Sequence, residues 1–139
     1  MANILAISQS RQAAWVMAEW ILLATWVTAC LAAMEPSFGK AIHLYGGLFT
    51  SYAADLTHPP WLYIGLRRRP VYAWARWVSS SPELVASSIF LAGALYEVSQ
   101  VFWPEGVFGG IFDPLDIVVY GAGLSVCYVA DKRGLREFL

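Results

Sequence analysis

The chain has 139 residues, of which 58% are hydrophobic and 14% charged, with nine basic and ten acidic side chains. A soluble domain of this length could not cover such long uncharged runs on every side, and the near balance of charge excludes a basic surface for nucleic acid. The composition therefore predicts a single membrane domain over residues 1–139.

The first membrane-spanning helix is predicted over residues 13–34, a run long enough to cross the hydrocarbon core of a bilayer. It stops before Glu35 and Pro36, because proline removes an amide donor from a helix interior and clashes with the preceding turn. Glu19 falls inside this span, in the half that we assign to the cytoplasmic side.

The second span is predicted over residues 41–66 and is expected to be irregular. Asp55 and the HPP sequence at 58–60 interrupt its apolar run. Since a residue before proline avoids helical backbone angles, we expect the helix to kink or end near Thr57 and to resume after the prolines.

The third and fourth spans are predicted over residues 84–103 and 112–130. The sequence SSPE at 80–83 precedes the third span and carries a capping serine, a proline suited to the first turn and a glutamate. Before it, the arginines and aromatic residues of 67–81 are typical of a segment at the lipid headgroups.

The orientation follows from the positions of the basic residues. One side of a four-span protein would carry eight of them and the other side only Lys40. Positive loops stay in the cytoplasm, so the sequence predicts a multi-pass protein of the bacterial inner membrane with both termini cytoplasmic. The expected fold class is all-α, a polytopic four-transmembrane-helix bundle. The eight are Arg11, Arg67, Arg68, Arg69, Arg76, Lys132, Arg133 and Arg136.

Acidic residues gather near the outer ends of the third and fourth spans. Glu97 and Gln100 are three residues apart, as are Asp113 and Asp116, so each pair lies on one helical face. Tyr120 continues the face of Asp116. These residues could surround one polar pocket. Because charged carboxylates are costly in lipid, they must there be protonated, paired, hydrated or bound to a cation or another charged ligand.

A plainer interpretation of these residues stays open. Asp113 would cap the fourth helix, and Asp116 would stabilise its N-terminus through the helix dipole. Glu97 would be protonated and hydrogen-bonded to Gln100 or to a neighbouring helix.

Three glycines are predicted to pack helices together. Gly93 lies in the third span, and Gly121 and Gly123 lie in the fourth. Small residues let membrane helices approach closely, so we expect the third and fourth helices to form a tight hairpin.

The C-terminal third resembles the VanZ-like family of small four-span membrane proteins. The resemblance rests on E-x-x-Q near the end of the third span, a short glycine-containing loop, and F-D-x-x-D entering a fourth span with glycines. It implies a protein associated with the cell envelope and implies little chemistry. Family members often carry an asparagine soon after the second aspartate, where this chain has Val119 and Tyr120. The matching residues are Glu97, Gln100, Asp113, Asp116, Gly121 and Gly123.

Other titratable residues suggest two weaker hypotheses. Glu19, Asp55 and His58, expected in the cytoplasmic half, could join the outer acids in a proton or cation route, or form separate hydrogen bonds. His43 or His58 could ligate haem or a pigment, although no cofactor is expected and His58 more simply caps the broken second helix.

No catalytic constellation and no metal site are expected from the spacing of the serines, histidines and carboxylates. The enzymatic alternative is metal-assisted hydrolysis by Glu97, Asp113 and Asp116. The leading hypothesis is instead a non-enzymatic accessory or structural subunit that packs in the bilayer with other subunits of an energy-transducing, respiratory or photosynthetic complex. The competing hypothesis is a VanZ-like envelope protein that binds a cation, a lipid or a cell-wall precursor at the outer acidic pocket.

Overall fold

The computed structural model describes residues 2–34, 48–70, 72–103 and 112–133, and all regular structure in these ranges is helical. This confirms the all-α class. The elements are α1 (Ala2–Met34), α3 (Leu48–Arg68), α4 (Ala73–Val78), α5 (Pro82–Phe102) and α6 (Pro114–Lys132).

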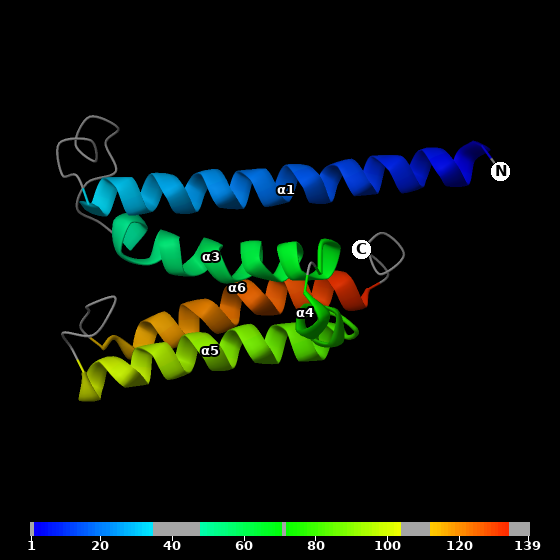
Figure 1. The fold of residues 1–139 in the computed structure, drawn as a ribbon. Coiled ribbons are helices and arrows are strands. Elements are labelled where there is room, and N and C mark those ends of the chain that lie inside the picture. The colour runs from blue at the N-terminus through cyan, green and yellow to red at the C-terminus, as the bar shows by residue number, and fades with distance from the viewer. Residues whose placement is uncertain (1, 35–47, 71, 104–111, 134–139) are drawn as a thin grey trace.

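The four long helices lie side by side and alternate in direction (Figure 1). Helix α1 packs mainly against α3, which also contacts α5 and α6, while α5 and α6 pack against each other. The start of α1 and the end of α6 lie at the same end of the bundle as the short helix α4 (Figure 1). Helix α3 therefore holds a central position in the arrangement.

Three segments within the described residues are long and apolar enough to cross a membrane, namely Ala13–Ala32, Pro82–Phe102 and Pro114–Lys132. Large apolar side chains are exposed along all three helices, as lipid contact requires. These features suit a multi-pass membrane protein. The exposed side chains include Met17 and Ile21 of α1, Leu91 and Leu95 of α5, and Val118 and Val126 of α6.

The predicted starts of the last two long helices are confirmed by their caps. The Ser81 hydroxyl accepts a hydrogen bond from the Leu84 amide at 3.1 Å, with Pro82 in the first turn. The Asp113 carboxylate accepts one from the Leu115 amide at 2.9 Å. Both contacts satisfy amides that a helix leaves without partners in its first turn.

The predicted end of the second helix near Thr57 is wrong, because α3 continues as a helix through Pro59 and Pro60. These prolines remove the amides that the Asp55 and Leu56 carbonyls would otherwise accept from. Helix α6 covers one of these carbonyls, since a Cβ added at Gly123 would lie 2.7 Å from the Leu56 oxygen. Residues 41–47 of the predicted span lie outside the described residues.

A small apolar core fills the end of the bundle that carries α4. It joins Tyr63 of α3, Val78 of α4 and Val85 of α5 to Leu124 and Cys127 of α6. This core fixes α4 against the long helices.

Candidate functional site

Polar side chains from three helices meet around the Tyr120 hydroxyl. This hydroxyl lies 3.2 Å from Asp55 Oδ1 and 3.0 Å from Glu97 Oε1. Asp55 comes from α3, Glu97 from α5 and Tyr120 from α6, so the contacts join all three helices. We call Asp55, Glu97 and Tyr120, together with Gln100 one turn beyond Glu97 on α5, the tyrosine-acid site.

The protons at the tyrosine-acid site do not suffice for two ionised carboxylates. A phenol hydroxyl carries one proton and can donate it to only one acceptor at a time. If Asp55 and Glu97 were both ionised, the Tyr120 hydroxyl could donate its proton to one of them. The hydroxyl oxygen would then lie close to an oxygen of the other carboxylate with no proton between the two. The site therefore has room for a further hydrogen-bond donor or a cation.

Two further oxygens of the tyrosine-acid site also lack a hydrogen-bond donor. Glu97 is only 2% exposed and Gln100 only 9%. Among the described residues, Glu97 Oε2 and Gln100 Oε1 have no hydrogen-bond partner. Buried polar atoms are normally hydrogen-bonded, and both of these oxygens are acceptors. What they lack is a donor or a positive charge.

The two aspartates of α6 lie beside the tyrosine-acid site. Asp113 caps α6 and accepts a hydrogen bond from the Tyr52 hydroxyl at 3.2 Å. Asp116, in the first turn of α6, lies within electrostatic reach of Asp55, Glu97 and Asp113. No side-chain hydrogen bond between described residues joins either α6 aspartate to Glu97. The expected capping role of Asp113 is confirmed.

The structure corrects the placement of Asp55. The sequence interpretation put it in the half opposite to Glu97, whereas both carboxylates lie within hydrogen-bond distance of the Tyr120 hydroxyl. Helix α3 begins at Leu48, so Asp55 lies only two turns from the helix start, at the level of Glu97 and Tyr120.

Two of the three predicted packing glycines lie as expected between α5 and α6. A Cβ at Gly93 would lie 2.9 Å from the Tyr120 ring, and one at Gly121 would lie 3.4 Å from the Phe90 ring. Gly123 instead faces α3, against Leu56 and Pro60. Gly93 therefore leaves the space in which the Tyr120 ring lies.

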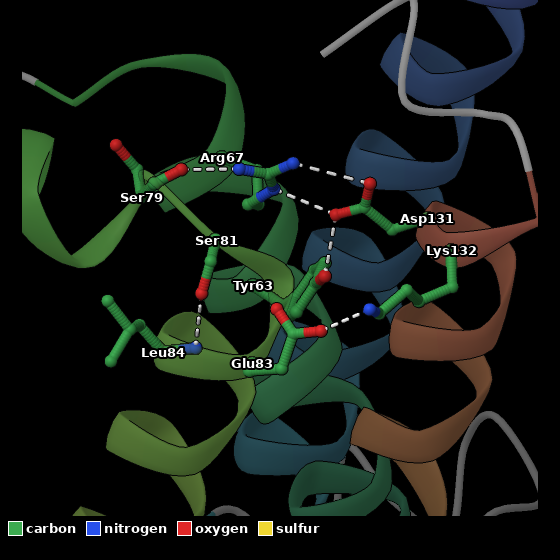
Figure 2. Close-up of polar contacts among 8 residues, drawn as sticks. All are labelled: Tyr63, Arg67, Ser79, Ser81, Glu83, Leu84, Asp131 and Lys132. Atoms are coloured by element: carbon green, nitrogen blue, oxygen red, sulfur yellow. Dashed lines mark hydrogen bonds and ion pairs between the residues drawn. The ribbon is translucent and has the colours of Figure 1, made fainter.

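A second polar group, the ion-pair network of Tyr63, Arg67 and Asp131, lies toward the α4 end (Figure 2). Asp131 is fully buried, with Arg67 Nε at 2.8 Å and the Tyr63 hydroxyl at 2.7 Å from its Oδ2. Arg67 also donates to the Ser79 carbonyl. Asp131 follows Tyr120 by eleven residues, so the two groups are about 16 Å apart along α6.

Further ion pairs surround this network. Glu83 pairs with Lys132 at the surface (Figure 2), and Glu19 of α1 pairs with both Arg68 and Arg69. Glu19 therefore fixes α1 to the end of α3. In this role Glu19 contacts arginines rather than the tyrosine-acid site, which the sequence hypothesis of a proton or cation route joined to it.

Of the two histidines, the structure describes the surroundings of His58. His58 lies inside α3 with its ring stacked 4.8 Å from the Trp26 ring and 6.0 Å from the Trp61 ring, so the expected capping role is wrong. His43 lies outside the described residues. Within the described ranges, no group of three or more histidine, cysteine, aspartate or glutamate side chains is arranged to hold a metal ion.

Comparisons with protein-family models, curated proteins and solved structures found no match. The resemblance to the VanZ-like family stays a hypothesis. The fold and the site define a helical protein with three candidate membrane spans and a buried tyrosine-acid site.

Proposed function

We propose that this chain is a four-span protein of a bacterial inner membrane that binds a hard cation at the tyrosine-acid site in exchange for a proton. The observation that carries the proposal is the single Tyr120 proton between Asp55 and Glu97, next to unpaired acceptors on Glu97 and Gln100. Oxygen-only donors of this kind suit sodium, magnesium or calcium ions better than soft metals.

The helix arrangement supports the proposed topology. With α3 as the fourth crossing, α1 starts and α6 ends on the side that carries α4 (Figure 1). Arg67, Arg68, Arg69, Arg76 and Lys132 belong to this end of the bundle. The positive-inside rule places that end in the cytoplasm, and hence the tyrosine-acid site in the outer half of the bilayer.

The exchange is balanced in charge for a monovalent ion. In the cation-free state a proton on one carboxyl group completes the hydrogen bonds around Tyr120. When the cation binds, that proton leaves, both carboxylates are ionised, and the cation takes the place of the lost positive charge. A divalent ion adds one further positive charge. Either state avoids two unpaired carboxylates in a low-dielectric interior.

Glu97→Gln is expected to abolish cation binding, because the amide cannot carry the exchanged charge. In purified protein at constant ionic strength, sodium, potassium, magnesium and calcium chlorides would be compared with N-methyl-D-glucamine chloride by thermal unfolding. At a hundredfold excess over Kd, the bound cation stabilises the fold by about 2.7 kcal/mol. This stabilisation should be lost in the variant.

Glu83→Gln is the matched control for this experiment. It lies on the same helix but pairs with Lys132 at the surface, away from the tyrosine-acid site. It should keep the cation-dependent stabilisation. Wild-type protein that responds to none of the four cations, or a Glu97→Gln variant that responds like wild type, would refute the proposal.

Gly93→Ala is expected to weaken cation binding while the protein still folds. The added methyl group would lie 2.9 Å from the Tyr120 ring, so the ring and its hydroxyl must move away from Asp55 and Glu97. The same thermal titration should need a higher cation concentration. Gly65→Ala is the control, since nothing lies within 4 Å of its added Cβ; equal titrations for both variants would contradict this positioning role.

A second candidate function is that of an accessory or structural subunit of an energy-transducing, respiratory or photosynthetic membrane complex. It is favoured by α1, which packs mainly against α3 and exposes Met17, Trp20, Ile21 and Leu31. Mild-detergent extraction, native separation and mass spectrometry test it. Co-migration with a large stoichiometric complex would support a subunit, and an absorption spectrum of the same band would reveal haem or pigment.

A further inference from the structure

A groove of about 240 Å³ runs between the C-terminal half of α3 and α4. Leu62, Gly65 and Leu66 line its apolar part, and Arg69, Tyr72 and Trp74 line its other end. Gly65 leaves this part open, because nothing lies within 4 Å of a Cβ added there. The groove is separate from the tyrosine-acid site.

The lining is mostly apolar and includes one charged side chain, that of Arg69. Leu62 precedes Arg69 by seven residues, a distance of about 10 Å along a helix. The Arg69 side chain is 63% exposed, and the exposed rings of Tyr72 and Trp74 stack beside it with centroids 6.1 Å apart. Aromatic and arginine side chains above an apolar surface are the arrangement found at lipid headgroups.

The arginines at and near the groove carry more positive charge than the acidic side chain that pairs with them can neutralise. Arg68 and Arg69 share the single carboxylate of Glu19, so the three side chains together keep one positive charge. Arg76 of α4 follows the lining residue Ala75 but does not itself line the groove; it is exposed, and within the described part of the chain its guanidinium has no hydrogen-bond or ion-pair partner. This charge is complementary to a phosphate group, which guanidinium binds with two parallel hydrogen bonds.

We infer that the groove between α3 and α4 binds an anionic phospholipid, with its phosphate at Arg69 and an acyl chain along Leu62, Gly65 and Leu66. The volume favours a chain over a protein helix, which is about 10 Å across. The inference rests on the proposed membrane location but is independent of cation binding.

The test uses delipidated full-length protein in detergent, titrated with phosphatidylglycerol or with phosphatidylcholine of the same acyl chains and followed by native mass spectrometry. Wild type should bind phosphatidylglycerol more tightly. Arg69→Gln should weaken that binding about fivefold, the effect expected for one arginine near a lipid surface. Gly65→Leu, which fills the groove without changing charge, should weaken the binding of both lipids.

Arg133→Gln is the matched control, because it removes an exposed arginine at the end of α6, outside the groove. It should bind phosphatidylglycerol like wild type. If Arg69→Gln unfolds through loss of its pair with Glu19, Gly65→Leu still decides the question.

Three results would overturn the inference. They are equal binding of the two lipids by wild type, wild-type affinity in Gly65→Leu, and a dimer mass that forms as lipid is lost, which would make a second copy of the chain the occupant. The cation titration of Gly65→Leu separates the two proposals, since a failed lipid site should leave the cation response unchanged.

Discussion

Asp131→Asn is expected to destabilise the folded chain by about 3–5 kcal/mol, the cost of removing one partner of a buried ion pair. Asp131 is fully buried and accepts hydrogen bonds from Tyr63 and Arg67. The variant leaves the Arg67 guanidinium, of which only 11% is exposed, without a counter-charge. Reversible unfolding in mixed micelles measures the change in free energy.

The surface pair of Glu83 and Lys132 provides the comparison. It lies beside the ion-pair network (Figure 2), but both side chains are exposed, Lys132 to 41% and Glu83 to 46%. Exposed ion pairs contribute little to stability, so Glu83→Gln should unfold nearly like wild type. Equal losses of unfolding free energy in Asp131→Asn and Glu83→Gln would show that the burial of Asp131 does not determine how much the network stabilises the fold.

Gly123→Ala is expected to destabilise the fold by about 1–3 kcal/mol through overpacking of α3 against α6. Its Cβ would lie 2.7 Å from the Leu56 carbonyl oxygen and 2.9 Å from Pro60 Cγ. The backbone oxygen and the proline ring cannot turn aside as a flexible side chain can, so the helices must separate. The unfolding free energy again measures the effect.

Gly65→Ala is the matched substitution in this case, because it places the same methyl group in open space on α3. There, the higher helix propensity of alanine should leave stability unchanged or raise it by up to about 1 kcal/mol. A Gly123→Ala variant as stable as Gly65→Ala would contradict the close approach of α3 and α6.

The features that the sequence could predict are local ones. Ser81 and Asp113 act as caps because the capping contact spans only two or three residues. Glu97 and Gln100 share a buried face because they are one turn apart on α5. Gly93 faces α6, as expected for two helices joined in sequence.

The features that it could not predict depend on how distant helices align. Asp131 and Arg67 are 64 residues apart, and Asp55 and Tyr120 are 65 apart. Hydropathy gives the extent of a span but not its register against its neighbours, so Asp55 was assigned to the wrong half. A lone aspartate at the end of the fourth span, with three arginines predicted on the same side, was the available signal for the ion-pair network.

The continuous course of α3 has the same origin. Two adjacent prolines would normally end or kink an isolated helix, because two carbonyls lose their partners. In this chain Gly123 brings α6 against the Leu56 carbonyl, and Pro60 packs on the same glycine. Tertiary packing thus lets the helix continue where the local signal predicted an end.

Simultaneous measurement of cation binding and proton release would test the central claim most directly. Weakly buffered, purified protein would be titrated with the cation that stabilises it, while bound cation and pH are followed together. The account predicts saturable binding with proton release in wild type and Glu83→Gln, and neither in Glu97→Gln. Saturable binding without proton release, or the same binding in Glu97→Gln, would contradict exchange at the tyrosine-acid site.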